Sequence, residues 1–596
     1  MNSFIYSFHH SAVPRLKFAE TPEFDFVVVG GGPAGCALAT RLAEAGHHSV
    51  LLIEQGTTIE QDPELRISSE LPLQTNSLHF TNFDAQYRSS ADEPITRRAI
   101  DINSGKVLGG STCINYCIWT RGPKDDYDLW AELVDNRAFS WEGISYIFDR
   151  VETSSRSSNP ISVRTISQSQ RSNPWSEVAA ASYEQSGHRR LPNINGGDML
   201  GYSELAESVD AEGNRSSANE YIRKFKQHMV QEKSSKGRLE IWTALKVEKV
   251  ITECAQDKEG SVINRCVGVQ TSFGVIRARK EVILTAGAIQ SPYLLLSSGI
   301  GPSDHLTEHG LEVIHDSPSV GQHLWDHPVS LVVFRLNKQS RGDTAEDLFN
   351  LMTMERHMDD WVNDSKGLMS GLPYEWIGLT NAQSQIEATL TRQNHELTPM
   401  EGRVLLRSTV PHFENFLMYG HGLTFAQDPR KTSYMSVATV LLAPRSRGSI
   451  TLSSSTSRDG SQVSEPKIVL NQLKEQVDQD VMVAAVEKAY DIFSTDAWAE
   501  YLEPQSKPTR EETMNLLKQT MRTLWHLGGT CSMTTKYAQG VVDNELRVQG
   551  IEGLRVADTS VIPFPLACHT QAVAYALGEL GAQFILQDHS VIQARL

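Results

Sequence analysis

The sequence predicts an α/β protein of two or more domains, and three observations lead to this prediction. At 596 residues the chain is too long for one compact hydrophobic core. Residues 24–29 form a short apolar run, typical of a strand that is buried on both faces. Closely spaced glycines, a segment of helical periodicity and a second apolar run at 50–53 follow it. This order of strand, turn, helix and strand is typical of a parallel sheet covered by helices.

The composition is that of an ordinary globular protein, with 40% hydrophobic and 21% charged residues. A formal net charge of -17 argues against a nucleic-acid-binding surface, because such surfaces carry an excess of Lys and Arg. No apolar run approaches the roughly 18 residues of a membrane-spanning helix. The first residues show neither a basic leader nor a continuous apolar stretch, so we expect a cytoplasmic protein.

The seven cysteines give no metal-binding pattern. Cys113 and Cys117 are not spaced as a Cys-x-x-Cys pair, and no second cluster supplies further ligands. An odd number of scattered cysteines favours reduced thiols, and we expect no metal ion.

The glycines after the first apolar run predict a dinucleotide site. Gly30, Gly32 and Gly35 fit the pattern Gly-x-Gly-x-x-Gly, in which they allow a tight turn, close approach of a pyrophosphate and close helix packing. Glu54 ends the second strand, where an acid can bind a ribose hydroxyl. An acid there disfavours the 2′-phosphate of NADP, whereas NAD and FAD both fit. The candidate contacts of this unit are Gly30, Gly32, Pro33, Ala34, Gly35, Glu54 and Gln55.

Four later segments resemble the glucose–methanol–choline (GMC) oxidoreductases, and they occur in the order of that family. GKVLGGSTCINYCIWTRGPKDDYDLW at 105–130 and GAIQSPYLLLSSGIG at 287–301 are similar to its two signatures. VGQHLWDHP at 320–328 resembles the turn that follows the second signature. GVVDNELRVQGIEGLRVADTSVIP at 540–563 resembles the C-terminal block of the family.

The resemblance extends from about residue 25 to residue 586 and implies that the cofactor is FAD. Locally, residues 563–585 are most similar to aryl-alcohol oxidases. Members with covalent flavin carry a histidine shortly before the paired glycines, and none occurs in 100–110, so a non-covalent flavin is implied. The further FAD contacts implied by the resemblance are Gly109, Gly110, Thr112, Asn115, Val247, Trp525, Asp558, Thr570 and Gln571.

The resemblance also implies a catalytic pair formed by His526 and His569. A neutral imidazole can take a hydroxyl proton near pH 7, and such a base typically contributes about 100- to 10,000-fold to the rate. Thr570 is expected to be the N-cap of a helix, whose dipole would keep the preceding His569 neutral. We therefore expect His526 to be the principal base and His569 its hydrogen-bonding partner. His323 and His327 are expected to be structural.

The implied architecture is a discontinuous Rossmann-like FAD-binding domain and a substrate domain with an antiparallel sheet, the GMC fold. The FAD-binding domain is expected at 22–160, 236–327 and 522–596, the last of which contains both histidines. The substrate domain is expected at 161–235 and 328–521.

The implied reaction is oxidation of a small-molecule alcohol to a carbonyl compound. His526 would take the hydroxyl proton, the carbon would give a hydride to flavin N5, and O2 or another acceptor would reoxidise the flavin. The lack of a secretory leader favours intracellular specialised metabolism. Two alternatives stay open: an FAD-containing lyase without net redox chemistry, and a non-catalytic flavin-binding protein. The light-driven decarboxylase branch is disfavoured because it lacks the histidine pair.

Two features of the substrate half have open interpretations. Residues 335–367 are polar and of helical character, and would form either a lid or a surface excursion. Aromatic residues in this half would either line an apolar pocket or belong to the core. They are Tyr374, Trp376, Phe413, Phe416 and Tyr419.

Overall fold

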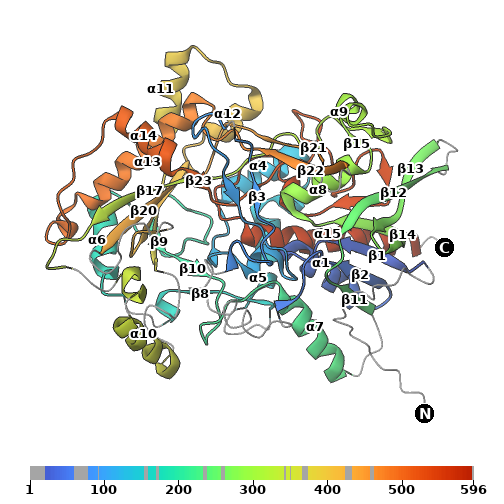
Figure 1. The fold of residues 1–596 in the computed structure, drawn as a ribbon, viewed down its shortest axis with the longest axis horizontal. Coiled ribbons are helices and arrows are strands. Elements are labelled where there is room, and N and C mark those ends of the chain that lie inside the picture. Colours follow the sequence, from blue (N-terminus) through green and yellow to red (C-terminus); the bar gives the residue numbers. More distant parts are fainter. Residues whose placement is uncertain are drawn as a thin grey trace.

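Two sheets, of eight and six strands, organise the chain in the computed structural model (Figure 1). The residues that the structure describes are 21–59, 78–91, 93–153, 159–169, 173–232, 238–256, 262–340, 344–349, 351–364, 373–422, 433–456 and 462–593. Within these ranges no helix has both the length and the apolar character that crossing a bilayer requires.

The eight-stranded sheet contains the strand, turn, helix and strand expected from the sequence. Its strands are β1 (Glu23–Val29), β2 (Ser49–Ile53), β11 (Arg238–Trp242), β12 (Val247–Gln256), β13 (Val262–Thr271), β14 (Gly274–Leu284), β24 (Ile551–Glu552) and β25 (Leu554–Val556). Their order is β11-β2-β1-β14-β13-β12, with β24 beside β13 and β25 beside β14. β1 is parallel to β2 and β14, and α1 (Pro33–Glu44) connects β1 to β2. The predicted α/β class is therefore confirmed.

Segments far apart in sequence complete this sheet. β25 pairs in parallel with β14, so that Leu554 lies opposite Val282. The long helix α15 (Gln571–Gln593) packs on α1, and Figure 1 shows it passing behind the sheet region in red. A Cβ at Gly578 would lie 2.3 Å from the carbonyl oxygen of Ala34, so the two helices meet closely because this residue is glycine. The start of α15 is thereby held beside the first glycine turn.

The six-stranded sheet is antiparallel, as expected for the substrate domain. Its strands are β9 (Gly201–Glu204), β17 (Pro328–Arg335), β18 (Trp376–Thr380), β19 (Phe413–Met418), β20 (Tyr434–Leu441) and β23 (Arg522–Thr523), in the order β23-β17-β20-β19-β18-β9. Along β19, Phe413 and Leu417 join the core that packs on α13 (Gln476–Phe493), whereas Phe416 and Met418 belong to a separate apolar cluster. Successive side chains of a strand point to opposite faces, so the second cluster lies on the face of the sheet opposite α13.

The two sheets draw on the chain segments that the sequence assigned to the two domains, except that β23 of the six-stranded sheet falls in 522–596, which was assigned to the FAD-binding domain. The segment limits themselves stay a prediction. The proposed lid at 335–367 contains α10 (Leu351–Asp364), which Figure 1 shows at the lower edge of the molecule. Parts of the stretch, at 341–343, 350 and 365–367, lie outside the described residues. The role of this stretch as a lid also stays a prediction.

Candidate cofactor and active site

A long cavity begins at the carboxyl ends of β1 and β2 and extends to the open face of the six-stranded sheet. The crevice at the carboxyl ends of parallel strands is the usual binding site of this sheet type. All predicted site residues except Gly35 and Gly109 line the cavity. The predicted residues that line it are Gly30, Gly32, Pro33, Ala34, Glu54, Gln55, Gly110, Thr112, Asn115, Val247, Trp525, His526, Asp558, His569, Thr570 and Gln571.

The first glycine turn fits a pyrophosphate group. Gly30 has a φ of 111°, which side-chain-bearing residues rarely adopt, and a Cβ at Gly35 would lie 1.9 Å from the carbonyl oxygen of Gly30. Gly35 therefore allows α1 to pack against the turn. A Cβ at Gly32 would meet no protein atom within 4 Å, so this residue borders open cavity space at the N-terminus of α1. The free amides and dipole of a helix N-terminus favour an anion there.

The second glycine turn rests on the first. The amide of Gly109 donates to the carbonyl of Gly31 at 2.7 Å, and a Cβ at Gly110 would lie 2.7 Å from Cα of Gly32. Thr112 stabilises this turn, since its hydroxyl donates to the carbonyl of Gly109 at 2.6 Å. Both glycine turns therefore border the same part of the cavity.

Glu54 lies where a ribose is expected. Its carboxylate accepts hydrogen bonds from the amides of Gly31 and Gly56, each at 2.8 Å, and burial raises its pKa to about 7. A carboxylate has about four acceptor positions, so two backbone bonds leave room for a hydroxyl donor. Val247 and Gln55 line the cavity at the same end.

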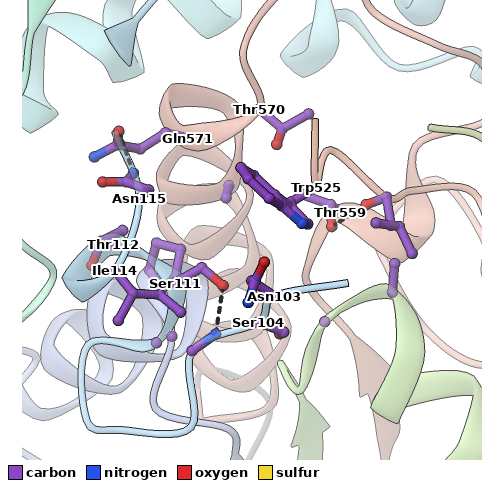
Figure 2. A pocket seen from close by; sticks show the side chains of 18 of the residues that line it. Asn103, Ser104, Ser111, Thr112, Ile114, Asn115, Trp525, Thr559, Thr570 and Gln571 are labelled. Atoms are coloured by element: carbon purple, nitrogen blue, oxygen red, sulfur yellow. Dashed lines mark hydrogen bonds between the residues drawn. The ribbon is translucent and has the colours of Figure 1, made fainter. Parts of the chain in front are cut away.

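Asn115, Gln571, Thr570 and Trp525 lie around the middle of the cavity (Figure 2). The side-chain amide of Asn115 donates from Nδ2 to Oε1 of Gln571 at 2.9 Å. This hydrogen bond joins the loop after the second glycine turn to the start of α15. α15 begins directly after Thr570, in agreement with the expected N-cap position.

Asp558 connects the end of β25 to α8 (Gly287–Ser297). Its carboxylate accepts from the amide of Gly287 at 2.9 Å and from the hydroxyl of Ser291 at 2.6 Å. Burial raises the pKa of this carboxyl group. Asp558 therefore holds the start of α8 at the cavity wall.

The structure brings His526 and His569 together although 43 positions separate them. Their ring centroids lie 4.8 Å apart, with an angle of 76° between the ring planes. A Cβ at Gly528 would lie 2.3 Å from the ring of Trp325, so the turn after His526 packs directly on that indole. The amide of His569 donates to the hydroxyl of Thr120 at 2.7 Å. The backbone at both histidines is thus fixed in position, by packing of the turn that follows His526 and by the hydrogen bond at His569.

Three residues that the sequence analysis did not assign to the site support this pair. Nδ1 of His327 lies 3.0 Å from Nδ1 of His526, and Oε1 of Glu414 lies 2.9 Å from Nε2 of His569. Asp326 accepts from the amide of His526 at 3.1 Å. Glu414 is only 1% exposed and His327 is fully buried. The adjacent Asp326 and His327 in the motif VGQHLWDHP were the available signal, whereas nothing near Glu414 in the sequence indicated its contact.

Burial controls the charge of His526 and His327. The pKa of His526 lies well below the usual 6.5, because its ring is deeply enclosed and the imidazoles of His569 and His327 are close. Burial, together with His569, lowers the pKa of His327 to about 3. His526 is therefore uncharged at neutral pH and can accept a proton.

The aromatic residues of the substrate half divide into two groups. Tyr374 and Phe416 line the cavity. Trp376, Phe413 and Tyr419 do not line it and pack with the core on the other face of the sheet.

Comparisons with known proteins agree with this site. The family models of GMC oxidoreductases match residues 24–329 and 444–578. The chain is 27% identical over 601 residues to pyranose dehydrogenase 3 of Leucoagaricus meleagris, covering 95% of this chain and 94% of that protein. It is 29% identical over 585 residues to an oxygen-dependent choline dehydrogenase of Brucella anthropi, covering 95% and 96%. A solved variant of formate oxidase from Aspergillus oryzae has a TM-score of 0.80 and 25% identity, covering 96% of this chain and 100% of that one.

The matched segments cover most of the chain and contain both glycine turns and both histidines. GMC oxidoreductases use FAD and act on CH–OH groups of their donors. The cavity, the glycine turns and the comparisons thus agree, and the chain belongs to the GMC oxidoreductase family.

Proposed function

We propose that the protein oxidises an alcohol to a carbonyl compound, with His526 as the base, His569 as its partner and FAD bound without a covalent link. Bound in the cavity, FAD would supply the hydride-accepting chemistry, with O2 or another acceptor as the final oxidant. The observation that carries this proposal is the pair of imidazoles that lines the cofactor cavity with centroids 4.8 Å apart.

The contact with His327 determines which nitrogen of His526 can act. If Nδ1–H of His526 donates to Nδ1 of His327, only Nε2 of His526 is free, and it carries a lone pair. A lone pair on Nε2 is what a base needs to take the hydroxyl proton. The low pKa of His526 supports the same assignment, because it keeps the ring neutral before the alcohol arrives.

Glu414 has the corresponding effect on His569. Because Nε2 of His569 is occupied by the carboxylate of Glu414, Nδ1 is the nitrogen available to the alcohol oxygen. If Nε2–H of His569 donates to Glu414, Nδ1 carries the lone pair that accepts a hydrogen bond from the alcohol. The alcohol oxygen would then lie between two imidazoles, which would fix the orientation of the carbinol group.

Replacing His526 with Ala tests the proposal. We expect the variant to keep its flavin, while flavin reduction by an alcohol slows by about 100- to 10,000-fold through loss of the base. Anaerobic stopped-flow absorbance measures the reduction. His228→Ala on α7 (Asn219–Glu232), an exposed residue that does not line the cavity, is the control and should reduce at the rate of the unaltered protein. Near-normal reduction in His526→Ala would refute the assignment. Failure of every alcohol to bleach the unaltered protein would favour the lyase alternative.

A further inference from the structure

The cavity end beyond the histidines is formed by the six-stranded sheet. Val329 and Leu331 of β17, Phe416 and Met418 of β19, and Ala438 of β20 all line it. Within β17 and within β19 the two positions are two apart, which places them on one face of the strand. With Tyr374 they belong to a single apolar cluster. The wall opposite the cofactor end is therefore a continuous apolar surface.

Aromatic rings approach this end from both domains. Phe416 lies with its ring centroid 6.3 Å from that of His569 and 5.9 Å from that of Tyr374, both nearly edge to face. On the other side, Tyr116 stacks on Trp525 at 5.9 Å, with only 16° between the planes. All four aromatic rings belong to residues that line the cavity. A flat ring placed between these walls would meet both faces and edges of aromatic side chains.

Charged side chains lie at the other end. Among the described residues that line the cavity, the only Asp, Glu, Lys or Arg side chains are Glu54, Lys246 and Asp558, and all three come from the ends or edges of the eight-stranded sheet. Glu414, the carboxylate nearest the histidines, does not line the cavity and is engaged by Nε2 of His569. Hence no described residue that lines the alcohol end of the cavity carries a carboxylate or guanidinium group.

We propose that the substrate is an uncharged alcohol whose carbinol group is attached to an apolar body, preferably an aromatic ring. This inference rests on the proposed alcohol oxidation at His526 and His569. A substrate with an ammonium group would lose hydrating water at this wall without gaining an oppositely charged side chain. A sugar would bind with most of its hydroxyl groups lacking hydrogen-bonding partners. An apolar ring has no polar groups to desolvate, and it gains apolar contact with Phe416 and Tyr374 and with the stacked rings opposite them.

A panel of alcohols added anaerobically to the FAD-loaded protein tests the inference. We expect cinnamyl alcohol and benzyl alcohol to bleach the flavin with a kcat/KM at least about 100-fold above that of choline, glucose or 4-(hydroxymethyl)benzoate. The charged or multiple hydroxyl groups of the last three compounds would find few polar partners at the apolar wall. Equal or faster bleaching by choline, glucose or the carboxylate would overturn the inference while leaving alcohol oxidation intact.

Binding without turnover separates this inference from the proposed function. Acetophenone, an apolar ketone that cannot be oxidised further at its carbonyl, should perturb the flavin absorbance and saturate, whereas betaine should have no effect. This comparison decides the inference even if no alcohol bleaches the flavin, an outcome that would count against the proposed function alone. Saturable binding of betaine, or absence of binding by acetophenone, would overturn it.

A matched pair of variants on β19 tests the aromatic wall. Phe416→Leu removes the ring that lines the cavity, and Phe413→Leu makes the same change on the opposite face of the same strand. We expect Phe416→Leu to weaken acetophenone binding and to lower kcat/KM for cinnamyl alcohol by about 3- to 10-fold, the usual worth of an aromatic pair. Phe413→Leu should leave both within about 2-fold. Both variants should retain flavin, and equal losses in the two would contradict a contact specific to Phe416.

Discussion

At the scale of single residues, the proposed mechanism depends on the residue that contacts each of the two imidazoles. His526 is backed by another imidazole, His327, whereas His569 is backed by the carboxylate of Glu414. A carboxylate that accepts from a histidine N–H fixes the tautomer and the orientation of the ring. We therefore propose Glu414 as a positioning residue that acts through His569.

Substitution of Glu414 tests this role. Glu414→Leu removes the acceptor and leaves a buried imidazole N–H unpaired, which typically costs about 1–3 kcal/mol of stability. Because the carboxylate no longer fixes the tautomer and orientation of the ring, kcat should also fall. Glu414→Gln keeps an amide oxygen that can accept the same hydrogen bond, so it should recover most of kcat. Flavin content should stay normal in both, and kcat should fall more than KM rises. Equal loss of activity in the two variants would show that Glu414 matters for packing or charge rather than as an acceptor.

The pH dependence of flavin reduction follows from the lowered pKa of His526. Only the neutral ring can take a proton, so activity is lost where His526 becomes protonated, below its lowered pKa. The groups that face it are His569, His327 and the Asp326 carboxylate at its amide. We expect kcat/KM to stay level as the pH falls from about 8 to about 6.5 and to decline only below that, since 6.5 is the usual value for histidine. An inflection at or above 6.5 would contradict a buried neutral base.

At the scale of elements, different glycines of the β1–α1–β2 unit are required for folding and for cofactor binding. A Cβ at Gly35 would collide with the carbonyl of Gly30 at 1.9 Å, whereas a Cβ at Gly32 meets no protein atom within 4 Å. Gly35 therefore serves the packing of α1, and Gly32 keeps space for the pyrophosphate.

The pair Gly32→Ala and Gly35→Ala should separate these two effects. Gly32→Ala should fold normally, because its φ of -78° suits alanine, but bind little FAD because its methyl group occupies pyrophosphate space. Gly35→Ala should lose folded protein as well as flavin. Circular dichroism and the ratio of flavin to protein absorbance measure both. A fully yellow Gly32→Ala protein would place the pyrophosphate elsewhere.

The sequence predicted this unit well because all of its signals are local. The apolar runs, the glycine spacing and Glu54 fall within 24–54, and the strands form at 23–29 and 49–53. The contact between Glu414 and His569 could not be predicted in this way. It depends on the pairing of β19 between β18 and β20 and on the place of that sheet beside α15, and no local spacing encodes either. The same holds for the division of Phe413 from Phe416, because the register of β19 decides which of them faces the cavity.

At the scale of the whole molecule, the cavity exists only because distant segments assemble around it. The two glycine turns come from the first fifth of the chain, the apolar wall from its middle, and the histidines from its last eighth. The eight-stranded sheet provides charged and backbone groups that suit a dinucleotide, and the six-stranded sheet provides the apolar surface where we propose that the alcohol binds. The histidine pair lies where these two environments meet, which suits a reaction that passes a hydride from substrate to cofactor.

The most direct test of this account is anaerobic mixing of the FAD-loaded protein with cinnamyl alcohol carrying either hydrogen or deuterium on the carbinol carbon. Our account predicts that both alcohols bleach the flavin absorbance completely and that the deuterated alcohol does so more slowly, because the carbinol C–H bond breaks as the flavin is reduced. A flavin absorbance that persists with both alcohols, or bleaching at the same rate with both, would contradict it.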